Sequence, residues 1–359
     1  MFVGLGAIVT IGAEKHKATQ DHGGLYDLSG MTDEGFLDIP LECVEVAGIS
    51  LLERMVERFT AIGVERVSIL VDEKISDRLP QFRTNFANVT VKVVRELYPA
   101  MTQELADFSQ NEIGHAFISS ARAYAETDLL DFFCFHREAR QAATRSCDKK
   151  GLLDLWAVDC AKAQRGDLES FLKDAGRDSA PKYFIWEYVN RLVHLRDLRQ
   201  FAVDILKRNC ETGPCGRQLR PGVWVDTDGE IHRRARIVAP AYVGCASKVK
   251  ADALITRFST IERDCCVDSG TVVEDTSILA NTTVGICLDL CHAIAGGNKL
   301  WNLERDVAVE IIDGSVMRFS SASRKAANNG HLIAPATAAV LQTAPMPDTW
   351  QFSNNLIQE

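Results

Sequence analysis

Residues 231–284 read IHRRARIVAPAYVGCASKVKADALITRFSTIERDCCVDSGTVVEDTSILANTTV, and an aliphatic side chain returns at every sixth position of this stretch. A small side chain follows four positions after each aliphatic one, from Ala235 to Thr283. The two series run in phase, which indicates a six-residue structural repeat. The aliphatic series consists of Ile231, Ile237, Val243, Val249, Ile255, Ile261, Val267, Val273 and Leu279.

A period of six residues is typical of one short strand followed by a tight turn. Three such units close one triangular coil of a parallel β-helix, with the aliphatic side chain inside and the small one at the corner. The repeat therefore predicts an all-β domain over residues 223–317, with about three stacked coils at the usual strand spacing of ~4.8 Å. Residues 285–306 break the period and suggest an inserted loop, residues 307–311 suggest a final strand, and residues 318–359 read as a tail.

The first half of the chain has the pattern of an α/β domain. Residues 7–11, 67–71, 89–94 and 129–135 read as strands, because each is a short apolar or alternating run. Residues 50–62, 116–124 and 195–206 read as helices, and Gly63 ends the first of them. The segment 209–222 contains Gly-Pro and Pro-Gly pairs and reads as a linker, and Trp186 is expected in the core.

Composition limits the classes of function. The 359 residues, 46% of them hydrophobic, are enough for about two domains. A net charge of −9 argues against a nucleic-acid partner, and the lack of an apolar run of 18 residues argues against a membrane span. The eleven cysteines show no paired Cys-x-x-Cys spacing, so we expect free thiols in a cytoplasmic protein.

The order of parts resembles the sugar-1-phosphate nucleotidyltransferases, or nucleotide-sugar pyrophosphorylases. Residues 40–54, PLECVEVAGISLLER, are similar to the family segment Pro-Lys-Pro-Leu…Gly-x-Pro-Leu-Leu, and residues 63–67 are similar to the following Gly-Val-x-x-Ile. The resemblance implies a Rossmann-like nucleotidyltransferase domain over residues 1–208, the linker 209–222 and a left-handed hexapeptide β-helix over 223–317. It implies the conversion of a nucleoside triphosphate and a sugar 1-phosphate to a nucleotide-sugar and pyrophosphate, with Mg²⁺ as cofactor.

Carried onto this sequence, the resemblance places Gly12 and Lys15 at the triphosphate, after the first strand. Gly12 fits a tight-turn glycine equally well. The resemblance also assigns Gly48 and His136 to nucleotide binding, and it assigns Arg137 and Lys15 to catalysis. Open α/β sheets bind ligands at the carboxyl ends of their strands, where His136 and Arg137 are expected to lie.

Three departures from the family pattern weaken the prediction that the protein catalyses nucleotidyl transfer. Glu14 stands in the phosphate loop, Leu41-Glu42 replaces a lysine, and the residues 136–138 replace the magnesium-binding aspartate. Glu138 and Glu187 are the candidate substitute metal ligands. A catalytically inactive homologue that binds a nucleotide or nucleotide-sugar, or that serves as a scaffold, therefore stays open beside the enzyme.

A second class of hexapeptide-repeat proteins consists of acyltransferases, in which a histidine acts as general base between subunits. His232, His292 and His331 are the candidates here, and a structural role is the simpler reading for His232 and His292. Because such domains pair along their flat faces, we also expect a homo-oligomer.

Overall fold

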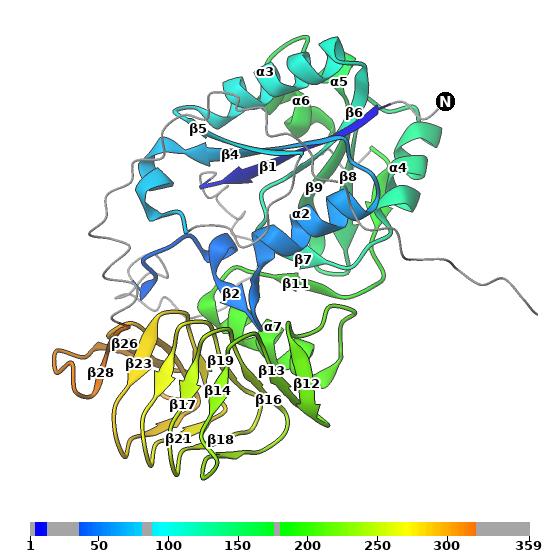
Figure 1. The fold of residues 1–359 in the computed structure, drawn as a ribbon. Coiled ribbons are helices and arrows are strands. Elements are labelled where there is room, and N and C mark those ends of the chain that lie inside the picture. The colour runs from blue at the N-terminus through cyan, green and yellow to red at the C-terminus, as the bar shows by residue number, and fades with distance from the viewer. Residues whose placement is uncertain (1–3, 13–35, 81–87, 176–179, 321–359) are drawn as a thin grey trace, which may run out of the picture.

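The computed structural model describes residues 4–12, 36–80, 88–175 and 180–320. Its first part is a mixed sheet with helices on both faces (Figure 1). The strands β5, β4, β1 and β6 are parallel neighbours, and β9 joins β6 in the antiparallel direction. The sheet order is β10 (Lys182–Phe184), β8 (Ala143–Asp148), β9 (Gly151–Asp159), β6 (Ile113–Ser119), β1 (Gly4–Ile11), β4 (Arg66–Asp72) and β5 (Val89–Val94).

Alternation along the central strand divides the apolar core into two layers. Ala7 and Val9 of β1 pack with the helices α2 (Leu51–Ala61) and α4 (Leu129–Glu138). Ile8 points to the opposite face, where α3 (Leu97–Gln110), α5 (Cys160–Ala163) and α6 (Leu168–Ala175) lie. Small elements complete this part: η1 (Leu41–Cys43), β2 (Glu45–Val46), β3 (Ile49–Ser50), η2 (Glu73–Arg78), β7 (Ala123–Ala125) and β11 (Val189–Arg191).

The predicted strands at 7–11, 67–71 and 89–94 are confirmed, as are the helices at 50–62 and 195–206. Two predictions are wrong. Residues 129–135 form helix α4, because Asp128 caps its first turn by accepting the Leu130 and Asp131 N–H groups. Residues 116–119 belong to β6 and residues 123–124 to β7, because the apolar run at 116–118 fills the sheet beside β1.

The second part of the chain, residues 217–319, is called the coil domain below. Its strands form three sheets, and from β13 to β25 successive strands along the chain belong to the three sheets in rotation. This arrangement is compatible with the expected β-helix (Figure 1). The first sheet contains β12 (Arg217–Arg220), β13 (Val223–Val225), β16 (Ala241–Val243), β19 (Ser259–Ile261), β22 (Ser277–Ile278), β25 (Ala293–Gly296), β26 (Lys299–Asn302) and β27 (Val307–Glu310). The second contains β14 (Glu230–Ile231), β17 (Lys248–Val249), β20 (Cys266–Val267), β23 (Thr282–Val284) and β28 (Met317–Phe319). The third contains β15 (Arg236–Ile237), β18 (Leu254–Thr256), β21 (Val272–Glu274) and β24 (Asp289–Cys291).

The repeat keeps its phase as far as Val273 and then shortens by one residue. Ile261 pairs with Ile278, which takes the next place in the buried interior of the coil domain. Leu279, the ninth member of the sequence series, faces the interface with the first part of the chain instead. The prediction for Leu279 was therefore wrong, because a one-residue deletion near Asp275 and Thr276 shifts the register.

The small side chains at the corners have a second role besides their size. Ser247 donates its hydroxyl proton to the Glu262 carbonyl at 2.5 Å and accepts the Cys265 N–H at 2.9 Å. Thr271 likewise donates to the Gly285 carbonyl and accepts from Leu288. These hydroxyl groups satisfy backbone groups of the next coil, which a larger apolar side chain would leave buried without partners.

The expected inserted loop at 285–306 is also wrong. Leu290 of β24 continues the buried interior, and β25 pairs in parallel with β22, so the coil continues through this segment. β26 and β27 then close the first sheet in the antiparallel direction. The final strand expected at 307–311 is confirmed by β27, and of the predicted tail only Arg318, Phe319 and Ser320 lie among the described residues.

Helix α7 (Leu195–Lys207) joins the two parts (Figure 1). Its apolar face, including Leu198 and Phe201, packs in one cluster with Val46 of the α/β part and Tyr242 of the coil domain. The predicted linker 209–222 is partly regular, since it contains β12, which pairs with β13.

Candidate functional site

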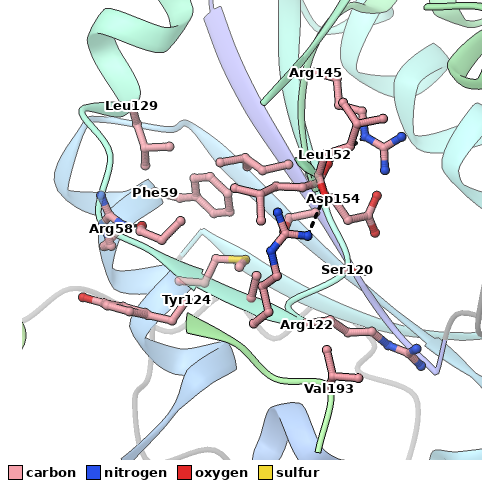
Figure 2. A pocket seen from close by; sticks show the side chains of 17 residues that line it. Arg58, Phe59, Ser120, Arg122, Tyr124, Leu129, Arg145, Leu152, Asp154 and Val193 are labelled. Carbon is pink, nitrogen blue, oxygen red and sulfur yellow. Dashed lines mark hydrogen bonds between the residues drawn. The ribbon is translucent and has the colours of Figure 1, made fainter. Parts of the chain in front are cut away.

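A pocket of about 250 Å³ lies where β6 ends, between α2 and the β8–β9 hairpin. This is the carboxyl end of a parallel strand, the usual ligand position in open α/β sheets. Figure 2 shows Arg58 and Arg145 at opposite sides of the pocket, with Phe59 and Leu152 between them. The lining residues are Met55, Arg58, Phe59, Ser119, Ser120, Arg122, Ala123, Tyr124, Ala125, Leu129, Arg145, Leu152, Leu153, Asp154, Leu155, Arg191 and Val193.

The walls come from six segments that the sheet brings together, at residues 55–59, 119–125, 129, 145, 152–155 and 191–193. Met55, Arg58 and Phe59 share one face of α2, because residues three and four apart on a helix are neighbours. The N-terminus of α2 is stabilised by a reciprocal capping box between Ser50 and Glu53. β7 pairs with β11, so Ala123 lies opposite Arg191.

Within the described ranges, neither Arg58 nor Arg145 forms a hydrogen bond with a carboxylate. The Arg58 guanidinium donates to the carbonyl oxygens of Ala125 and Thr127. Arg145 donates to the Leu153 carbonyl at 2.7 Å and lies 4.6 Å from the centre of the Trp156 ring. Burial lowers the pKa of Arg145, and the nearby Asp154 carboxylate opposes that shift. Carbonyl oxygens fix the position of a guanidinium group but leave its charge uncompensated.

Arg122 and Arg191 also face the pocket, and each has a carboxylate partner. Arg122 Nε lies 3.3 Å from Glu42 Oε1, and Arg191 forms an ion pair with Asp148. Arg191 also donates to the carbonyls of Gly151 and Leu152. Its buried Nε has no hydrogen-bond partner among the described atoms. The pocket therefore keeps donor capacity that its own residues do not use.

Asp154 is the one carboxylate among the lining residues. Its Oδ1 accepts the Trp156 indole N–H at 3.1 Å. The pocket thus combines apolar walls with four guanidinium groups and one carboxylate, and it is called the arginine pocket below. This lining favours a ligand that has an apolar or sugar-like body and negative groups.

Of the predicted phosphate-loop residues, the structure describes Gly12, which is not part of the pocket lining. Gly12 follows β1 with φ +81°, and a Cβ atom there would lie 2.5 Å from Ile75, so close packing in a turn requires glycine. Lys15 lies outside the described residues. Gly48 lies in the turn between β2 and β3, outside the pocket lining, and its N–H donates to Glu262 of the coil domain. Its assignment to nucleotide binding stays a prediction.

The other predicted site residues lie on or near α4. His136 was expected after a strand, but it is 1% exposed on α4 and contacts Thr144 Oγ1 through Nδ1 at 2.8 Å. Burial and then the neighbouring His115 lower the pKa of His136 to about 4, so it is neutral at physiological pH. Arg137 is exposed in the last turn of the helix, outside the pocket lining. The expected place of these two residues after a strand was wrong because the segment is helical, and their assigned roles stay predictions.

The expected magnesium ligands do not fit a metal site. Glu138 is exposed at the end of α4, and exposed Glu187 accepts the N–H of Trp186. Within the described ranges no three His, Cys, Asp or Glu side chains come together to hold a metal ion. Trp186 is 73% exposed, so its expected place in the core was also wrong.

The candidate acyltransferase histidines lie on the coil domain or beyond the described residues. His232 is exposed at the first coil. His292 Nδ1 lies 2.7 Å from Asp275, which also binds Arg199 of α7. That pair orients the imidazole ring but does not line the arginine pocket. His331 lies outside the described residues, and the acyltransferase reading stays a prediction.

Comparison with known proteins adds no assignment: no family model matches the chain, and no curated protein matches it. The helices in the described part of the chain include none that is both long and apolar enough to cross a membrane. None of the eleven cysteines is part of a disulfide bond.

Proposed function

We propose that this protein binds a phosphorylated small molecule, of the nucleotide or nucleotide-sugar class, in the arginine pocket. The observation that carries the proposal is that four guanidinium groups surround one cavity, while two of them, Arg58 and Arg145, donate hydrogen bonds only to carbonyl oxygens. A guanidinium group recognises phosphate through paired N–H donors, and a half-buried charge gains most from such a partner. The apolar wall around Phe59 and Leu152 suits a base or a sugar ring.

The fold supports descent from the sugar-1-phosphate nucleotidyltransferases. A Rossmann-like domain followed by a left-handed β-helix is the arrangement that the resemblance implies, and the strands of both parts are compatible with it. The proposal for this chain is a ligand-binding homologue that has lost nucleotidyl transfer. Two facts support that choice: the candidate metal carboxylates do not converge within the described residues, and His136 and Arg137 lie away from the pocket.

A thermal-shift screen tests the proposal. Nucleoside triphosphates, nucleotide-sugars, sugar phosphates and inorganic pyrophosphate are each added with Mg²⁺ and with a chelator. A ligand that binds the folded protein at 100 times its Kd stabilises it by about 2.7 kcal/mol. We expect at least one phosphorylated compound to raise the melting temperature, with or without Mg²⁺, and no pyrophosphate release. Stabilisation by none of them would contradict the proposal, and pyrophosphate release would show that transfer is retained.

A further inference from the structure

We infer that occupancy of the arginine pocket is transmitted to the linker before the coil domain, and that Glu126 is the positioning residue that couples the two. This inference rests on the proposed function and concerns the regulation of the same site. It depends on a continuous set of contacts between residues 123–127, the linker residues 211–213 and helix α2.

The segment after β7 belongs to the pocket on one side. Tyr124 and Ala125 line the cavity, and the Arg58 guanidinium binds the carbonyl oxygens of Ala125 and Thr127. The Arg58 guanidinium also lies 6.0 Å from the centre of the Tyr124 ring. An anion that binds Arg58 therefore acts on the same guanidinium group that fixes this segment.

The same segment holds the linker on its other side. Glu126 is 5% exposed, and its Oε1 accepts the Tyr124 hydroxyl at 3.0 Å, the Glu211 N–H at 2.7 Å and the Thr212 N–H at 3.1 Å. One buried carboxylate oxygen thus joins a pocket side chain to two linker amides. Because a buried acceptor is costly to leave with fewer donors, a shift of Tyr124 changes how firmly the linker is held.

Helix α2 provides a second connection. Arg54 lies one helical turn before Arg58 and is 5% exposed. It donates to Thr212 Oγ1, and to the Val46 carbonyl at 2.8 Å. The adjacent turn at Ala47 and Gly48 binds Glu262 of the coil domain. The pocket and the coil domain are therefore connected through Arg58, Arg54 and this turn.

Ordering of residues 123–127 by a bound anion is expected to order the linker as well. Thermodynamic linkage requires the reverse effect: loosening the linker weakens binding in the pocket by the same factor. Couplings of this kind typically change an affinity between about 5-fold and 150-fold. Removal of the Glu126 carboxylate is the most direct way to break the connection.

Hydrogen exchange followed by mass spectrometry tests the inference on the full chain. Inorganic pyrophosphate and UDP-glucose are the probes, and peptides that cover residues 120–127 and 209–216 are the readout. For a probe that binds, we expect exchange to slow in both peptides, by about twofold or more in the linker peptide. Protection of 120–127 with no change in 209–216 would overturn the inference and leave the proposed function standing. Protection of neither peptide by a probe that raises the melting temperature would place the ligand outside the pocket and overturn both.

Variants separate positioning from a merely structural role. E126A removes the acceptor oxygen, and we expect the probe Kd to rise about 5-fold or more and the linker protection to disappear. E126Q keeps an acceptor oxygen at that place and is expected to restore both. E304A removes an exposed carboxylate of the coil domain and serves as the matched control. If E126A does not fold, the wild-type exchange measurement and E126Q still decide the question: a linker peptide whose exchange does not slow when the probe binds, in either protein, overturns the inference.

Discussion

Glu262 of the coil domain accepts a hydrogen bond from the backbone N–H of Gly48, at 2.9 Å, across the boundary between the two parts of the molecule. Its other oxygen accepts the Ala47 N–H at the same distance. Gly48 and Glu262 are 214 positions apart in the sequence. A buried side chain of the repeat therefore fixes the turn that precedes α2, the helix that carries Arg58 into the pocket.

This contact predicts a specific pH dependence of stability. Burial and then the charge of Glu45 raise the pKa of Glu262 to about 8, while the N–H groups of Ala47 and Gly48 and the charge of Arg54 oppose the shift. The folded state therefore holds a proton that the unfolded chain releases above its ordinary value of 4.5. The stabilisation is complete below that value and is lost as the pH rises to about 8.

Urea denaturation at several pH values between about 4.5 and 8 measures this effect. The free energy of unfolding of the wild type is expected to fall with rising pH relative to that of E262Q, which cannot titrate. Parallel pH profiles for the two proteins would show that Glu262 titrates normally.

Gly48 itself is expected to tolerate no side chain. Its φ is +99°, and a Cβ atom would lie 2.2 Å from Tyr242 Oη and 2.7 Å from Cys215 Cβ. We expect G48A to lower the free energy of unfolding by about 2–4 kcal/mol, from backbone strain and overpacking together. G63A is the matched control, because Gly63 has φ +83° and open space around its Cβ position. G63A should cost only the strain, about 1 kcal/mol, and equal losses for the two variants would contradict the predicted clash.

The shortened repeat makes Ile278 the member of the series that fills the coil interior. It is fully buried, whereas Ile286, eight positions later, is 63% exposed. We expect I278A to destabilise the protein by about 2–5 kcal/mol and I286A to change its stability by less than about 0.5 kcal/mol. Chemical denaturation of both variants provides the comparison. A small effect of I278A would mean that the register does not shift as described.

The repeat was readable from the sequence because its signal is local and periodic. The buried positions from Ile237 to Val273 lie where the six-residue period put them. Ile278 was missed because the deletion beside Asp275 left a second aliphatic residue, Leu279, in the expected phase. The register of neighbouring strands, which the sequence does not display, decides between the two.

The α/β part was less readable because a short apolar run fits a strand or a helix. Residues 129–135 satisfy both patterns, and only the Asp128 cap, together with Leu129, Phe132, Phe133 and His136 on one helical face, indicates α4. The pocket had no local signal at all. Arg58, Arg122, Arg145 and Arg191 come from separate elements, and the sheet order that gathers them is a tertiary property.

Titration calorimetry with the phosphorylated compound that stabilises the protein most tests the central claim directly. The comparison uses wild type, R58Q and, as a matched control, R236Q on the exposed surface of the coil domain. Loss of the Arg58 guanidinium is expected to weaken binding about tenfold or more, since hydrogen bonds between charged groups contribute about 1.5–3 kcal/mol. R236Q should bind as the wild type does. Equal affinity of R58Q and the wild type would place the ligand elsewhere and contradict the account.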